Sequence, residues 1–331
     1  MSGSWDCFLR RVTDDRKRSL RCSLPVLFTA MLLLGSFTGQ ARLKTIDLFP
    51  IFFRCFEAFP TNPSERARSF AESLVKPHPE IFRRPEVFKT DPVSLKEYLD
   101  QAAVYLSAIK RIHARFLNES GPIEESFYAQ FSDFNRARVE IFLTPSLFRF
   151  DAKIPHDNPR ALFLGLDGLA KFHGINAHLG VILSHELFHL YHFQVNALPA
   201  DIEQIPLYRQ IWQEGLATYV SAFLNPKATL AEILLDPQLA DDGPKYLAKM
   251  AGALLPQLES TDDQTTAFYL SYRRESKTPS RIGYLIGYEI ARHLALTKSL
   301  KELSRLRGRR LLKIMRTEVR AMAADDRRTN F

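Results

Sequence analysis

The chain of 331 residues is 46% hydrophobic and 25% charged, and its formal net charge at pH 7 is +8. A chain of this length can bury a sizeable core, and this balance of apolar and charged residues is typical of a globular protein, which excludes long disordered tracts. The 14 glycines and 19 prolines show no periodic spacing, which excludes collagen-like and solenoid repeats.

Residues 1–41 have the pattern of a secretory signal. Six basic side chains lie between positions 10 and 21, and an apolar run follows from Leu24 to Gly39. The run leads into Gln40-Ala41, with small residues at the two positions that a signal peptidase reads. It is short for a membrane span, which needs roughly 20 apolar residues. We therefore predict a cleaved signal peptide and an exported protein, periplasmic or extracellular; the alternative is an uncleaved membrane anchor at residues 24–39.

Cleavage after Ala41 would leave a single cysteine. Cys7 and Cys22 belong to the leader, and only Cys55 follows it. One cysteine cannot form an internal disulfide, so export would not imply a disulfide-stabilised fold. It also excludes a structural zinc site rich in cysteine.

The segment 42–134 is predicted to be a mostly helical N-terminal region. Aromatic side chains crowd Thr45–Phe59, and prolines punctuate the stretch that follows. Ser94–Leu117 places its apolar residues close to the 3.6-residue period of a helix. We expect this region to supply packing, because nothing in it carries obvious chemistry.

Two short strands are expected after this region. Residues 138–144 alternate apolar and polar side chains, which is the strand period. Residues 161–165 form a short apolar run that ends before Asp167-Gly168, a turn pair. From about residue 176 the pattern is helical again. The fold class is therefore α+β and mostly helical, with a small sheet in a second region that spans residues 135–325.

A buried helix with two histidines is the strongest functional signal. Residues 177–195 are apolar on nearly every side, which is typical of a helix inside a core. His185 and His189 lie four residues apart, hence on one face, and two imidazoles in this geometry can bind one zinc ion. Glu186 follows the first histidine and completes an HExxH motif, in which it would act as the general base. Buried polar groups of this kind need partners, which favours a metal site over a chance match.

Catalytic zinc needs a third protein ligand, and Glu214 is the best candidate. His192 is about 10 Å along the helix axis from His185, too far for one ion to reach both, so we expect it to line the cleft or support a ligand. Glu214 lies on a second predicted helix that opens at Pro206, among apolar neighbours. Gly215 is unfavourable in mid-helix, which a close approach of two helices would explain.

The phrases HELFH and WQEGLATY resemble the gluzincin metallopeptidases, the thermolysin-like group of zincins. EGLA and, further on, GYLIGY are similar to the bacterial family of predicted zinc-dependent proteases called DUF2268, over about residues 135–300. This resemblance implies a zincin-like catalytic core with His185, His189 and Glu214 as zinc ligands and Glu186 as general base. It also implies that the strand Leu162–Leu166 is the edge strand that aligns a peptide substrate. Thr218 departs from the family pattern, which often has an acidic residue there.

A donor beside the metal is needed to stabilise the oxyanion of the tetrahedral intermediate. Tyr284 and Tyr288 are the leading candidates, on a helix predicted to start near Pro279. Tyr219 and Arg281 are secondary candidates. Gly283 and Gly287 flank the two tyrosines and would let this helix lie close to the active-site helix.

Basic residues recur through Lys301–Arg320 in an amphipathic pattern with an expected break at Gly308. A solvated basic face is the simplest interpretation; contact with an anionic surface or acidic partner is the alternative. No nucleic-acid-binding motif accompanies it. The sequence thus predicts an exported zinc peptidase that acts on peptides or proteins, with a catalytically inactive, zinc-stabilised binding protein as the alternative. It does not indicate an oligomeric state.

Overall fold

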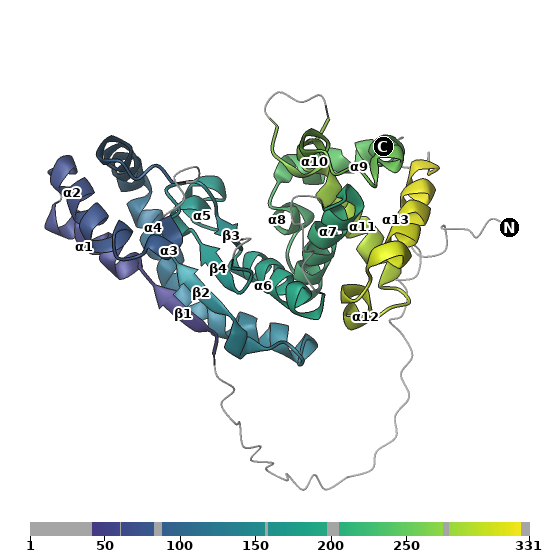
Figure 1. Cartoon of the computed structure of the whole chain (residues 1–331), viewed down its shortest axis with the longest axis horizontal. Coiled ribbons are helices and arrows are strands. Elements are labelled where there is room, and N and C mark those ends of the chain that lie inside the picture. The colour runs from purple at the N-terminus through teal and green to yellow at the C-terminus, as the bar shows by residue number, and fades with distance from the viewer. Residues whose placement is uncertain are drawn as a thin grey trace, which may run out of the picture. The chain divides into compact units, whose positions relative to one another are not determined.

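The structure is a computed structural model that describes residues 42–59, 61–82, 88–155, 158–196, 205–273 and 278–325 (Figure 1). Helices predominate and one small mixed sheet accompanies them, so the expected α+β class is confirmed. The chain from Ala41 onward forms one compact unit. The predicted signal or anchor at residues 1–41 lies outside the described ranges. Within those ranges, no helix is long and apolar enough to cross a membrane.

The sheet has four strands in the order β1-β2-β4-β3. Three strands are parallel and β3 is antiparallel to β4. The strand bounds are β1 Lys44–Asp47, β2 Glu140–Leu143, β3 Ala152–Lys153 and β4 Ala161–Leu164. The two strands predicted from the sequence are therefore β2 and β4. The sequence interpretation missed β1, because its four residues precede an aromatic-rich helix directly and show no alternation of their own.

The prediction that Leu162–Leu166 is an edge strand is wrong. Strand β4 lies between β2 and β3, and all four of its residues are buried. The edge on this side is β3, whose two residues are half-buried. A continuous apolar run is typical of an inner strand covered on both faces, which is the physical reason for the correction.

The N-terminal region is mostly helical, as predicted, and it shares one hydrophobic core with the rest of the chain. Asp91 caps α4 by accepting a hydrogen bond from the Ser94 N–H at 3.0 Å. The helix continues past its predicted end at Leu117 and through Pro122, because the burial of Phe127 and Tyr128 stabilises its last turns. The elements are α1 Phe49–Ala58, α2 Pro63–Phe70, the π-helix η2 Ala71–Val75, α3 Pro79–Phe82, α4 Pro92–Gln130 and the 3₁₀ turn η3 Arg136–Arg138.

Helix α5, Leu166–Phe172, contains the residues that were expected to form a turn. Asp167 is fully buried in its first turn and accepts hydrogen bonds from the Ser146 N–H at 2.7 Å and the Phe148 N–H at 3.0 Å. Gly168 lies against the Phe150 carbonyl, where a methyl group would overlap it. Asp167 and Gly168 thus hold the loop that leads into β3, and the turn interpretation is wrong.

The remaining chain is helical. Gly308 adopts a φ of 57° at the start of α13, and the predicted break in the basic segment is confirmed there. Helix α6 contacts α4, α7 and β3, so it joins the sheet to the C-terminal helices. The elements are α6 Leu179–Val195, α7 Leu207–Leu224, α8 Leu230–Leu234, α9 Pro237–Leu254, the 3₁₀ turn η5 Leu255–Gln257, α10 Asp263–Leu270, α11 Ile282–Leu294, α12 Leu300–Ser304 and α13 Gly308–Ala323.

Candidate metal centre

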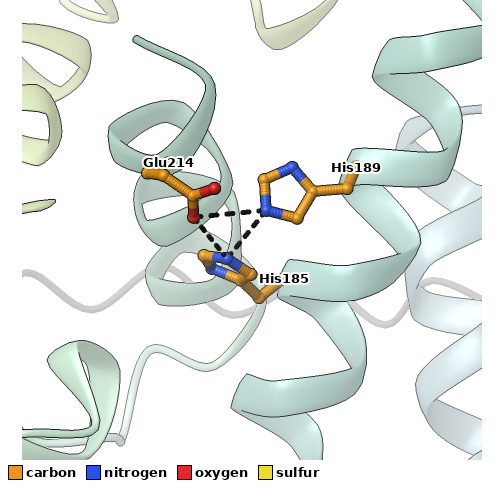
Figure 2. Close-up of side chains that lie close together, drawn as sticks. All are labelled: His185, His189 and Glu214. Atoms are coloured by element: carbon orange, nitrogen blue, oxygen red, sulfur yellow. Dashed lines mark hydrogen bonds and ion pairs between the residues drawn. The ribbon is translucent and has the colours of Figure 1, made fainter. Parts of the chain in front are cut away.

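Helix α6 carries the HExxH motif, and most of its residues are buried, as its all-round apolar pattern predicted. His178 caps its first turn, with Nδ1 accepting from the Val181 N–H at 3.2 Å. His185 and His189 lie one turn apart, and their ring centroids are 4.6 Å apart. Their imidazoles point toward the same side of the helix, where α7 passes (Figure 2).

Glu214 of α7 meets these two histidines (Figure 2). Its Oε2 lies 3.3 Å from His185 Nε2 and 3.4 Å from His189 Nε2, and the two Nε2 atoms are 3.0 Å apart. The three residues predicted as metal ligands are therefore brought together from two helices, although Glu214 lies 25 positions after His189 and 29 after His185. The triangle of one oxygen and two nitrogens is compact enough for a single ion to touch all three.

This triangle fits zinc by donor type and by size. Ligands at about 2.0–2.2 Å from a tetrahedral zinc ion are separated from one another by roughly 3.3–3.5 Å. The two distances from Glu214, 3.3 and 3.4 Å, fall in that range, and the 3.0 Å between the imidazoles is slightly shorter. Two imidazoles and one carboxylate leave the fourth position of a tetrahedron open, which is the arrangement of catalytic rather than structural zinc.

The position of Glu214 depends on how α7 packs against α11. A methyl group on Gly215 would overlap the backbone of Gly287, so the two helices approach backbone to backbone. The predicted reason for a glycine in mid-helix is confirmed, although the partner helix is α11 and not the HExxH helix. Thr218, one turn after Glu214, donates its hydroxyl to the Glu214 carbonyl at 2.8 Å and not to a histidine.

The electrostatics of the cluster favour an ionised Glu214. Burial alone would raise the pKa of Glu214, but the two imidazoles outweigh it and hold that pKa well below the usual range. Burial, with a smaller effect of His189, lowers the pKa of His185 against the opposing effect of Glu214. Burial alone would also lower the pKa of His189, but the negative charges of Glu214 and Glu186 outweigh it and raise that pKa. A neutral imidazole and a carboxylate are the protonation states that bind a metal ion.

Glu186 lies beside the same cluster, but its pKa is raised and that of Glu214 is lowered. Burial, together with the negative charges of Asp151 and Glu214, raises the pKa of Glu186 to about 7, against the opposing effect of His189. A carboxylate in this range can both accept and release a proton near neutral pH.

A cavity of about 380 Å³ opens beside the cluster. Its walls are polar around His185, Glu186 and His189, and they combine further polar side chains with apolar ones elsewhere. The edge strand β3 lines one side, with Asp151 directly before it. Asp151 is paired with His173, Oδ2 to Nε2, at 2.6 Å. No sequence signal marked this wall, because a two-residue strand is too short to show a period.

The structure separates the two tyrosines that were predicted as oxyanion donors. Tyr284 lines the cavity, and its ring stacks on His185 with centroids 6.4 Å apart and an interplanar angle of 18°. Tyr288, one turn further along α11, contacts the ring of Tyr219 at 6.2 Å, and neither of these two lines the cavity. Tyr284 therefore belongs with the metal cluster, whereas Tyr288 and Tyr219 lie apart from it.

His192 was expected to line the cleft or support a ligand. It is buried, stacks on Phe188 with centroids 5.5 Å apart, and does not line the cavity. It does not hydrogen-bond to either histidine of the cluster, and burial lowers its pKa to about 3. The cleft-lining expectation is wrong because a seven-residue step places His192 two turns beyond His185, among core side chains.

Arg281 was only a secondary candidate in the sequence, yet it lines the cavity beside Tyr284. Its guanidinium carbon lies 4.1 Å from the centroid of the Tyr284 ring. The cavity thus contains a fixed cation next to the cluster.

Comparison with models of protein families, with curated proteins and with solved structures finds no match for this chain.

Proposed function

We propose that this protein is a zinc-dependent peptidase of the gluzincin type, with a zincin-like core. The observation that carries the proposal is the triangle of His185, His189 and Glu214, whose spacing and donor atoms suit one zinc ion with an open position. A purely structural site would not need a further carboxylate at the ion. Glu186, adjacent to the first ligand and facing the cavity, is such a carboxylate.

The chain's own residues divide the chemistry of peptide hydrolysis among them. When bound, zinc would supply a Lewis acid that polarises the scissile carbonyl and makes water more acidic. Glu186 accepts the proton of the attacking water and then delivers it to the leaving amine. Its burial next to the cluster keeps it within reach of both groups.

Tyr284 is the donor that we assign to the oxyanion. Its hydroxyl lies in the cavity near Glu214, and burial, together with the negative charge of Glu214, raises its pKa well above the usual value. A phenol that stays protonated can donate a hydrogen bond to the developing negative charge without transferring its proton.

A peptidase of this kind would be exported if residues 1–41 act as the predicted signal. The mature chain would then begin at Arg42, and its first residues determined by mass spectrometry of the processed protein would show this. An N-terminus that retains residues 24–39 would support the membrane-anchored alternative.

The direct test of the function is Glu186→Gln. We expect this variant to bind zinc like the unaltered protein and to lose at least about 1,000-fold in kcat on a mixed peptide substrate, because only the proton acceptor is removed. Glu125→Gln, which alters an exposed carboxylate on α4, is the matched control and should retain full activity. Unchanged turnover in Glu186→Gln would overturn the mechanism. Zinc binding without peptide cleavage by the unaltered protein would support a binding protein instead.

A further inference from the structure

Arg281 occupies an unusual position at the wall of the cavity. It is the residue directly before α11, and its φ of 54° places it in the left-handed region. Residues other than glycine rarely adopt this backbone conformation, and those that do are often found at active sites and ligand-binding sites. The conformation turns the guanidinium toward Tyr284 and the cavity.

Contacts on several sides fix this guanidinium. One nitrogen donates to the Leu234 carbonyl at 3.2 Å and to the Tyr272 hydroxyl at 2.9 Å. The rings of Tyr284 and Tyr272 lie against it, with centroids 4.1 and 4.9 Å from its central carbon. An arginine held in this way loses little side-chain entropy when it binds a further group.

The charge of Arg281 has no carboxylate partner among the described residues, since its hydrogen bonds go to neutral oxygens. Asp151, a further acid on the cavity wall, is paired with His173. Glu214 and an ionised Glu186 together carry two negative charges, which the two positive charges of a zinc ion would balance. A cation without a counter-ion in a partly buried cavity favours an anionic ligand.

We propose that Arg281 determines substrate specificity by binding a carboxylate of the peptide close to the scissile bond. This inference rests on the proposed peptidase function. The carboxylate belongs either to a Glu or Asp side chain or to a free C-terminus, because a guanidinium binds both in the same two-pronged manner.

The geometry indicates that Arg281 binds the carboxylate of a substrate residue close to the scissile bond and does not contact the scissile carbonyl itself. Arg281 contacts Tyr284, and Tyr284 in turn stacks on the ligand His185. The guanidinium is thus one side chain removed from the metal cluster. Apolar side chains of Ile233, Leu234 and Leu235 line the cavity on the α8 side, and they would accommodate the non-polar part of that residue.

The test compares matched fluorogenic peptides with the zinc-loaded protein. In the first set of pairs, one peptide has Glu and the other has Gln at the same position, and each position around the scissile bond is tested in turn. In a further pair, one peptide has a free C-terminus and the other has an amidated one. We expect kcat/KM to be at least about tenfold higher for the carboxylate member of one pair, and which pair responds identifies the source of the carboxylate. Equal rates within every pair would overturn the inference and leave the peptidase proposal standing.

Substitutions of Arg281 test whether this side chain causes the preference for the carboxylate peptide. Arg281→Gln should reduce the preference to near one, and Arg281→Lys should retain part of it, since the charge remains but the two-pronged geometry is lost. Arg292→Gln is the matched control, because Arg292 lies on the same helix, pairs with Glu289 at 2.6 Å and is absent from the cavity wall. A preference that persists undiminished in Arg281→Gln would contradict the assignment.

Binding separates this inference from the catalytic proposal. Titration of Glu186→Gln by calorimetry with the preferred peptide and its uncharged partner should show the same order of affinity as the rates. The melting temperature of each variant reports whether it is folded. If the unaltered protein neither cleaves nor binds any of these peptides, the peptidase proposal fails and this inference fails with it.

Discussion

Gly215 of α7 and Gly287 of α11 face one another so closely that a methyl group on Gly215 would overlap the Gly287 backbone and lie 2.6 Å from the Tyr288 amide nitrogen. The contact matters for the candidate site because each glycine is close to one of its residues on the same helix. Glu214 precedes Gly215, and Tyr284 lies one turn before Gly287. Backbone contact between the two helices therefore sets the distance between Glu214, the proposed third metal ligand, and Tyr284, the proposed oxyanion donor.

Gly215→Ala should destabilise the protein by about 1–3 kcal/mol, because the added methyl group meets a backbone that cannot rotate away. Urea unfolding measures this change. The control is Gly252→Ala on α9, where the methyl group would meet only Ala323 at 3.8 Å, and where alanine should stabilise by up to about 1 kcal/mol through helix propensity. Equal effects at the two positions would show that α7 and α11 are not in backbone contact.

Tyr284→Phe should lower kcat by about 100-fold and leave KM nearly unchanged, because the hydroxyl is needed only when negative charge develops on the substrate oxygen. The ring remains, so its stacking on His185 is kept. Tyr288→Phe is the matched control from the same helix, and its activity should stay within about twofold, since Tyr288 lies outside the cavity. Steady-state kinetics on one peptide substrate decides, and a larger loss for Tyr288→Phe would refute the assignment.

Asp133 gives a pH-dependent stability contribution that is independent of the metal site. Its carboxylate pairs with Lys301 at 3.1 Å and Arg305 at 2.7 Å. Partial burial alone would raise the pKa of Asp133, but these cations outweigh it and lower that pKa below 3.8. A carboxylate whose pKa is lower in the folded state stabilises the protein above its unfolded pKa, and this stabilisation is lost as the pH falls through the folded value.

We expect Asp133→Asn to lose about 0.5–1 kcal/mol of unfolding free energy at pH 7, a modest figure because the carboxylate is 38% exposed and screened by solvent. The difference from the unaltered protein should shrink once the pH is below 3.8. Asp100→Asn, which removes an exposed i,i+4 pair on α4, should change stability by less than about 0.5 kcal/mol. Denaturant unfolding across this pH range measures both, and a gap that widens in acid would contradict the pairing.

The grouping of His185, His189 and Glu214 could be predicted from the sequence because the two helices that carry them have strong local signals. HExxH within an apolar helix places two histidines on one face by helical geometry alone, and Glu214 among apolar neighbours with a glycine beside it marks a buried carboxylate at a helix contact. The α+β class and two of the strands were likewise visible as periodic patterns. These features depend on residues close together in the chain.

What could not be predicted depends on long-range packing. Strand β3 has two residues, and its place at the sheet edge follows from pairing with β4 and not from its own pattern. The choice between Tyr284 and Tyr288 needed the direction of α11 relative to α7, since both tyrosines suit one helix face in the sequence. The direction of the Arg281 side chain depends on a left-handed backbone conformation that no sequence motif predicts.

The central claim is that His185, His189 and Glu214 hold one catalytic zinc ion, and zinc content is its most direct measurement. After loading with zinc and extensive dialysis, mass spectrometry of the metal should find one zinc ion per chain in the unaltered protein and in His192→Gln, whose altered residue lies outside the cluster. Glu214→Ala should retain less than about a tenth of that content under the same conditions, because a zinc ion with two imidazole ligands alone is weakly held. Full zinc content in Glu214→Ala, or none in the unaltered protein, would contradict the account.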